Sequence, residues 1–434
     1  MMKNRALRDV VALFAVAVFF ALECPASAQF KAGETFGKPD ADKLKEVVSP
    51  GVSFFVKHGM TIKVVDPQPI PWPKAYKEAT EKFSSQVKLA SDGVSIDNYV
   101  AGSPFPTVET NDPKAALKIM WNYEYRPYPG TDDFVEFEFP IYSGSLTYDH
   151  PMNTERQMLM GEVRRLYFNG RLYNDPKPIY PSKDDYRFKE LLGPVVSPFD
   201  LKGLGALEFR YRSAAHQDDT WLYLPTLRRV RRLSTTQRSD ALFGQDTDPD
   251  SYWGYNGHIA WQEWKLLGEK EMLAVFHGAN YPMKRCDGGA DFTFCDNWEK
   301  RKMYVIEGKS KLPQYAYGKR ILFIDKESMV VAYSDVYDQR GEIWKVWLDN
   351  HQFRKKSRPD SKVEYPEEKD FYAGFTFVDV QMGHATYTPH PGPDVPDHDG
   401  WYFDAAEKAT NRYNPQGSKD EVFTIQALLS GGGG

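Results

Sequence analysis

Arginine is concentrated in one short segment, WLYLPTLRRVRRLS at residues 221–234, where four of five consecutive residues are arginine. An aromatic and aliphatic run precedes them. A guanidinium group binds a carboxylate or phosphate through two parallel hydrogen bonds, which lysine cannot do. The pattern therefore predicts a site for a ligand with an apolar body and an anionic head. The residues predicted to bind this ligand are Trp221, Tyr223, Leu224, Arg228 and Arg231.

A second interpretation of these arginines is an ordinary charged sheet face, because the outer faces of antiparallel sheets are commonly solvated. A third is a surface that contacts an anionic partner. Carboxylates near the segment in the sequence are Asp218, Asp219, Asp240 and Asp246. Arginines on other predicted strands that would extend the positive patch are Arg164, Arg165, Arg210 and Arg212.

Two cysteines, Cys286 and Cys295, flank the segment CDGGADFTFC, whose glycine pair allows the chain to fold back. In an oxidising compartment such a pair predicts a local disulfide that closes one loop. A redox pair or half of a metal site is the alternative. Both are less well supported, because the spacing is not C-x-x-C and no histidine lies between the cysteines.

Sequence signatures of enzymes are missing. There is no G-x-S-x-G and no P-loop, and GLGALE at 203–208 lacks the third glycine of a dinucleotide fingerprint. The segment DTDPD at 246–250 begins like a calcium loop but lacks the turn glycine and the glutamate at the twelfth position. We therefore expect no cofactor, no metal site and no catalytic residues.

Several acidic residues and histidines are interpreted as solvated groups. The pairs Glu136/Glu138 and Asp218/Asp219 lie on predicted half-exposed strands, where neighbouring acids confer solubility. The histidines at 384, 390 and 398 lack the spacing of a metal motif and are interpreted as loop residues.

The N-terminus has the pattern of a secretory signal peptide. Basic residues precede a 13-residue apolar run from Val10 to Leu22, and Ala26-Ser27-Ala28 forms a small-x-small cleavage site. The run is shorter than the about 20 residues that a membrane-spanning helix needs. We expect residues 1–28 to be removed and the mature protein to be periplasmic. Its mild net charge gives no support for a nucleic-acid partner.

Helical patterns occur only near the N-terminus, at 40–48, 74–88 and 112–123, within a region of about 40–125. From 134 to about 380 the sequence alternates as in β-strands, beginning with FVEFEFPIY at 134–142. Asn169-Gly170 predicts a tight hairpin within residues 162–173. We predict one domain over 29–430 followed by a flexible tail at 431–434, with a large curved antiparallel sheet covered on its concave side by the few helices.

Three dispersed motifs resemble those of the DUF1329 family: NYVAGSPFP with DPKAALKIMWN, then DDTWLYLPTLRRVRRLS with GYNGHIAWQEWKLLGEKEML, then KRILFIDKESMVVAYSDVYDQRGEIWK. The family is grouped with exported carriers of the LolA/LolB type. The resemblance implies an unclosed antiparallel barrel, an envelope location and a lipophilic ligand. It supplies no catalytic residues.

Together these features predict a periplasmic carrier or chaperone for a lipophilic, anionic-headed molecule or a lipoprotein acyl chain. Its expected partners are a hydrophobic small molecule or lipid and an inner-membrane transporter or outer-membrane protein. The alternative is a non-enzymatic adaptor subunit of an envelope transport complex. A hydrolase is the third hypothesis.

Overall fold

An antiparallel sheet dominates the fold in this computed structural model, which describes residues 30–131, 133–234, 237–359, 361–390, 401–403 and 417–429. The predicted signal peptide, the tail at 431–434 and His398 lie outside the described residues. Successive strands of the sheet are antiparallel neighbours. In spatial order they are β12 (Gln262–Ala274), β13 (Asp296–Ser310), β14 (Lys319–Asp325), β15 (Val331–Tyr337), β16 (Ile343–Asn350), β19 (Gly374–Asp379), β20 (His384–Pro389), β5 (Phe134–Ser145), β6 (Asn153–Tyr167), β7 (Tyr186–Leu192), β9 (Gly205–Tyr211), β10 (Asp219–Leu224) and β11 (Arg229–Arg232).

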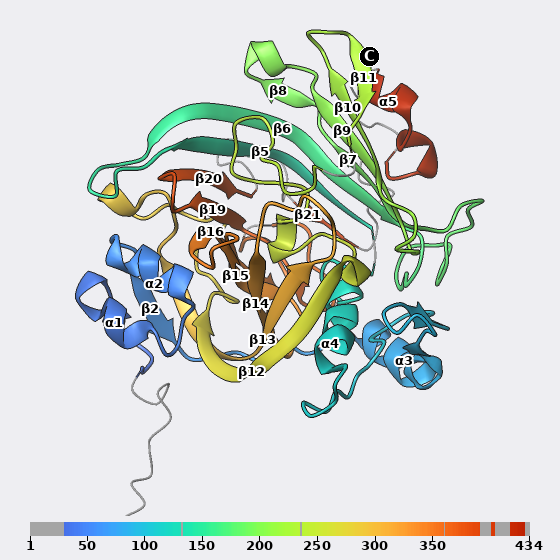
Figure 1. The fold of residues 1–434 in the computed structure, drawn as a ribbon, viewed down its shortest axis with the longest axis horizontal. Helices are drawn as coiled ribbons and strands as arrows, with labels where there is room; N and C mark the ends of the chain where they lie inside the picture. The colour runs from blue at the N-terminus through green and yellow to red at the C-terminus, as the bar shows by residue number, and fades with distance from the viewer. Residues whose placement is uncertain are drawn as a thin grey trace, which may run out of the picture.

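Shorter strands complete a sheet of 17 strands among the described residues. β2 runs parallel to the first four residues of β13, and β1 pairs with β2. β8 pairs with β6, and β21 pairs with β5. The sheet is not closed: β12 lies at one edge and β11 at the other, with β5 and β6 arching over the meander (Figure 1). The bounds of these strands and of two small separate pairs are β1 (Thr35–Phe36), β2 (Ile62–Val65), β8 (Val195–Ser197), β21 (Trp401–Tyr402), β3 (Lys88–Leu89) with β4 (Ile96–Asp97), and β17 (Phe353–Arg354) with β18 (Lys369–Asp370).

The helices are few and short, as predicted. The α-helices are α1 (Ala41–Leu44), α2 (Pro50–Lys57), α3 (Lys74–Phe83), α4 (Ala115–Glu124) and α5 (Ile425–Leu429). The helices expected at 40–48, 74–88 and 112–123 are confirmed with shifted ends. Within the described residues, no helix has the length and apolar character needed to cross a membrane.

Both faces of the meander are apolar, because β14 and β15 carry buried side chains at nearly every position. We call the face with Met303, Val305 and Phe323 the outer face, and the face with Tyr304 and Leu322 the inner face. The N-terminal segment with α1 and α2 covers the outer face, and α4 packs on the inner one. The helices therefore cover two faces and not the concave side alone, since a strand that is apolar on both sides needs cover on both.

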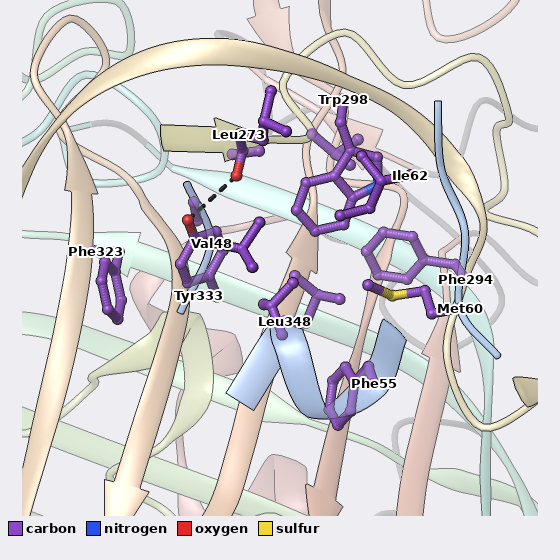
Figure 2. Close-up of a cluster of buried hydrophobic side chains, with 14 of the residues drawn as sticks. Val48, Phe55, Met60, Ile62, Leu273, Phe294, Trp298, Phe323, Tyr333 and Leu348 are labelled. Atoms are coloured by element: carbon purple, nitrogen blue, oxygen red, sulfur yellow. Dashed lines mark hydrogen bonds between the residues drawn. The ribbon is translucent and has the colours of Figure 1, made fainter. Parts of the chain in front are cut away.

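The outer-face cluster is the largest core of the protein (Figure 2). Phe55 of α2 and Ile62 of β2 pack with Trp298, Tyr333 and Leu348 of the sheet. The hydroxyl of Tyr333 donates a hydrogen bond to the carbonyl of Leu273 (3.2 Å), so its polar atom is satisfied inside the cluster.

Helix α2 is held on the sheet by one carboxylate. Ser49 caps the helix by accepting a hydrogen bond from the amide of Val52, and its hydroxyl donates to Asp335 of β15 (2.8 Å). The amide of Gly51 donates to the same carboxylate (3.0 Å). A side chain at position 51 would collide with Asp335 and Val346, so glycine sets how closely the helix approaches.

The prediction of a hairpin at Asn169-Gly170 is wrong for the second strand, because no strand follows the turn directly. Gly170 does make the turn, at φ +76°, but the chain then runs irregularly until β7 begins at Tyr186. Residues 171–181 contain three prolines, which cannot donate to a strand ladder. Arg171 turns inward instead and pairs with Asp133 (2.6 Å).

We expect Gly51→Ala to lower the free energy of unfolding by about 1–3 kcal/mol, since the added methyl group overpacks the contact between α2 and the sheet. Urea unfolding followed by circular dichroism measures the change. Gly37→Ala is the matched control, because its nearest neighbour would lie at an ordinary 3.7 Å. Equal stabilities of the two variants would contradict the close contact.

Candidate functional site

A cavity lies on the inner face, between β5–β7 on one side and β16, β19 and β20 on the other. The space open to the centres of water molecules is about 80 Å³, and the whole recess with its mouth measures about 640 Å³. One buried water needs about 10–15 Å³ of such space, so the interior has room for several waters or a small apolar group. The lining residues are Glu136, Phe139, Ile141, Val163, Arg165, Glu190, Leu192, Gln245, Tyr252, Trp253, Trp347, Tyr372, Phe375, Thr388, His390 and Trp401.

Seven of the sixteen lining residues are aromatic. Trp347 stacks on Phe375 with ring centroids 4.2 Å apart, and Trp253 lies 4.7 Å from Tyr372. Ring faces bury much apolar area while keeping a fixed shape, so this wall suits an apolar ligand group.

A buried acid and a buried imidazole lie in the wall. His390 Nδ1 is hydrogen-bonded to Glu136 Oε1, and both residues are almost fully inaccessible. Burial raises the pKa of Glu136 well above its usual range and lowers the pKa of His390 to about 3. Burial therefore favours the neutral form of both groups. Glu136 Oε2, His390 Nε2 and the hydroxyl of Thr388 have no hydrogen-bond partner among the described residues.

Arg165 is the one cationic side chain among the described lining residues, and it is paired with the carboxylate of Glu190. Arg165 Nε donates to Glu190 Oε2 at 2.7 Å, and its guanidinium lies over the ring of Phe188. A second anion placed beside Arg165 would leave an excess buried negative charge, which is costly in a site of low dielectric constant.

A second polar network fixes the aromatic wall from behind. Asp349 accepts hydrogen bonds from the hydroxyl of Tyr372 and from Trp347 Nε1. Burial raises the pKa of Asp349 to about 7. Burial also disfavours the charged form of His351, but the Asp370 carboxylate at 2.8 Å outweighs it and raises the pKa of His351 to about 9. Two rings of the cavity wall are thus oriented by bonds that a ligand does not need to break.

The segment from 237 to 261 fills the rest of the inner face and supplies three wall residues. Arg238 donates to Asp218 (2.8 Å), the residue before β10, and to Asp250 (2.6 Å) of its own segment. Asp218 also binds Arg210 of β9 (2.6 Å). This buried network holds Gln245, Tyr252 and Trp253 at the cavity.

The residues predicted from the hairpin lie on different sides of the sheet. Trp221 and Tyr223 pack on the outer face, in a cluster with Val422, Phe423 and Leu428 of the C-terminal segment. Leu224 lies on the inner face, in a cluster that also contains the cavity residue Phe139. Arg228 and Arg231 are exposed. None of the five lines the cavity, and their assignment as ligand contacts stays a prediction.

The other arginines do not join the hairpin arginines, because each has its own carboxylate. Arg164 pairs with Glu162, Arg165 with Glu190, Arg210 with Asp218 and Arg212 with Asp185, while Arg232 of the hairpin pairs with Asp219. The interpretation of paired charges is therefore confirmed for Arg232 and Asp219.

The sequence interpretation missed Glu136 and His390. Glu136 was expected to be solvated, but β5 is buried on both faces and Glu136 is fully inaccessible. His390, expected in a solvated loop, follows strand β20 and is buried against Phe139, with ring centroids 4.6 Å apart. His384 is paired with Asp246 (2.8 Å). The aromatic residues on both sides of Glu136 in FVEFEF were the available signal of burial.

The disulfide prediction is confirmed: Cys286 and Cys295 are bonded, with an S–S distance of 2.00 Å. The three carboxylates of DTDPD diverge to His384, Tyr317 and Arg238. No cluster of three or more side chains able to ligate a metal occurs in the described part of the chain.

Comparison with known proteins identifies one family. A model of the family described as "Protein of unknown function (DUF1329)" matches residues 37–428. An uncharacterized protein of Pseudomonas aeruginosa, PA3922, is 25% identical over 370 residues, which span 80% of this chain and 73% of that protein.

Two solved structures show weaker similarity. A DUF1329 family protein from Desulfovibrio piger is 16% identical, with 69% of this chain and 92% of that chain covered and a TM-score of 0.43. A LolA superfamily protein from Nitrosomonas europaea is 14% identical, with 72% and 98% covered and a TM-score of 0.35.

Glu136 and His390 should have opposite effects on the pH dependence of stability. Between about pH 4.5 and 6.5, the unfolded chain protonates His390 and releases the proton of Glu136, while the folded chain does the reverse. The two contributions oppose each other in the wild type. Glu136→Gln should therefore gain stability relative to wild type as the pH rises, and His390→Gln should lose it, each by up to about 1.4 kcal/mol per pH unit.

Urea unfolding at several pH values across this window measures both slopes. Slopes of the same sign for Glu136→Gln and His390→Gln would contradict the neutral pair.

Proposed function

The chain belongs to the DUF1329 family, as its motifs predicted, and the description of that family names no activity. From the cavity we propose that the protein is an exported carrier that holds the apolar end of a lipophilic molecule. The observation that supports this proposal is the aromatic cavity between β5–β7 and β16–β20. The space open to the centres of water molecules, about 80 Å³, is smaller than the about 300–1,000 Å³ that is typical of small-molecule sites, so the cavity fits one part of a ligand.

The size of the enclosed space defines what is held. About 80 Å³ takes the end of an acyl chain or a small ring, and the remainder of a longer ligand would extend through the mouth. Carriage of a lipoprotein acyl chain is compatible with this arrangement. A lipid enclosed over its whole length is not.

The charges of the lining favour an uncharged buried group. Arg165 is paired with Glu190, and burial keeps the Glu136–His390 pair neutral. A hydroxyl or an ester on the ligand would find partners in Glu136 Oε2 and His390 Nε2, which lack any among the described residues. An anionic head would meet Arg228 and Arg231 only outside the cavity, because neither lines it.

Export of the carrier is part of the proposal. The pattern of residues 1–28 is that of a signal peptide, and the Cys286–Cys295 disulfide is typical of an oxidising compartment. A periplasmic location would place the carrier between the inner-membrane and outer-membrane partners that the sequence resemblance implies.

Tryptophan fluorescence tests the proposal directly, because three of the ten tryptophans line the cavity: Trp253, Trp347 and Trp401. Bromine quenches tryptophan emission on contact. We expect brominated decanol to quench part of the emission saturably, and unbrominated decanol to compete with it. Native mass spectrometry should show one alcohol bound per chain.

Val163→Phe should reduce this binding at least about tenfold, since the larger ring fills the cavity into which Val163 projects. Val230→Phe makes the same substitution at a half-buried valine on the outer face and should bind like wild type. Unsaturable quenching, or equal binding by both variants, would contradict a carrier that uses this cavity.

A further inference from the structure

The arginine-rich hairpin ends beside a second exposed turn. In the β9–β10 register Gly205 is opposite Tyr223, and in the β10–β11 register Leu224 is opposite Arg229. The turn at 225–228 therefore lies at the same end of the sheet as the loop that precedes β9. That loop contains the short 3-10 helix η4 (Phe199–Leu201). Figure 1 shows β8 and β11 at this end of the molecule, its upper edge in that view.

Large apolar side chains are exposed at this end of the sheet. Phe199 is 93% exposed and Leu227, in the β10–β11 turn, is 49% exposed. Leu429 of α5 is 41% exposed and follows Leu428, which packs at Gly205. Phe199 and Leu227 belong to the two turns at this end of the sheet, and Leu429 belongs to the helix that packs on β9–β11.

The same end carries uncompensated positive charge. Arg228, Arg229 and Arg231 are exposed, and no described carboxylate forms an ion pair with them; Arg232 is the member of the run that does, with Asp219. The η4 loop adds Lys202 and Asp200, whose charges offset each other. We call the set Phe199, Leu227, Leu429, Arg228, Arg229 and Arg231 the basic tip.

We propose that the basic tip docks the protein on a lipid bilayer that contains anionic headgroups. Phe199 and Leu227 would enter the headgroup region, where aromatic and aliphatic side chains lose water-exposed area. The three arginines would lie over the lipid phosphates, which guanidinium groups bind through paired hydrogen bonds. Charge complementarity favours this occupant, since a neutral apolar partner would leave all three arginines unused.

The basic tip is separate from the cavity, so its test does not depend on the proposed carrier function. None of its residues lines the cavity. Co-sedimentation with phosphatidylcholine vesicles, with and without phosphatidylglycerol, measures docking. We expect binding that requires phosphatidylglycerol and weakens as salt is added.

Arg228→Gln/Arg229→Gln/Arg231→Gln should reduce the affinity for anionic vesicles on the order of a hundredfold, at about fivefold per arginine. The matched control removes the same charge from exposed lysines elsewhere, in Lys77→Gln/Lys82→Gln/Lys88→Gln, and should bind like wild type. All six side chains are exposed, so both variants should fold, and circular dichroism confirms it.

Phe199→Ser should reduce the affinity about tenfold, whereas Phe199→Trp should retain it. Met382→Ser, at a side chain that is 78% exposed in the turn between β19 and β20, is the control for loss of an exposed apolar group. Equal binding with and without phosphatidylglycerol would overturn the proposal, as would equal losses for the arginine and lysine variants. An acidic protein as the partner would appear as no vesicle binding at all, and would overturn it too.

Discussion

The buried carboxylate of Asp218 connects strand β9 with the segment 237–261 on the inner face. It binds two guanidinium groups, Arg210 of β9 and Arg238 of the segment that fills the inner face. Arg238 also forms an ion pair with Asp250, and the carboxylate of Asp250 accepts a hydrogen bond from the hydroxyl of Tyr315. Removing one member would leave a charge buried without a partner, at a cost of several kcal/mol. The network therefore specifies where the segment 237–261 lies.

Polar contacts fix the position of the segment 237–261. The segment therefore does not have to pack into all the space on the inner face, and the cavity remains. Lys345 of β16 donates to the carbonyl of Asp246 (2.8 Å), and Tyr317 donates to Asp248 (2.6 Å). These contacts hold the backbone at a set distance from β16. Apolar side chains alone would collapse until no space remained, because each lost contact at a void costs dispersion energy. Rings oriented by hydrogen bonds cannot relax in this way, and they leave a space of defined shape.

The sequence allowed the sheet, the few helices, the disulfide and the family to be predicted, since each depends on local pattern or on motifs in order. The two-sided burial of the meander was also present in the sequence, in runs such as RILFID, where apolar residues do not alternate with polar ones. The alternating spacing of FVEFEF placed Glu136 on a solvated face, although the aromatic residues on both sides of it were a signal of burial. That burial depends on His390, which is 254 residues away, and on Trp401, which pairs with Glu136 across β21 and β5. Charged residues in a strand normally face solvent, so a local pattern assigns them there.

One buried apolar cluster connects the cavity with the elements that carry the basic tip. The inner-face cluster that contains the cavity residues Phe139 and Ile141 also contains Leu222 of β10, with Leu201 of η4 and Leu224 packed against it. Leu224 is the last residue of β10 before the turn that carries Leu227, and Leu201 belongs to the same short helix as Phe199. The hairpin combines apolar residues with arginines because its strand belongs to the apolar interior and its turn to the surface.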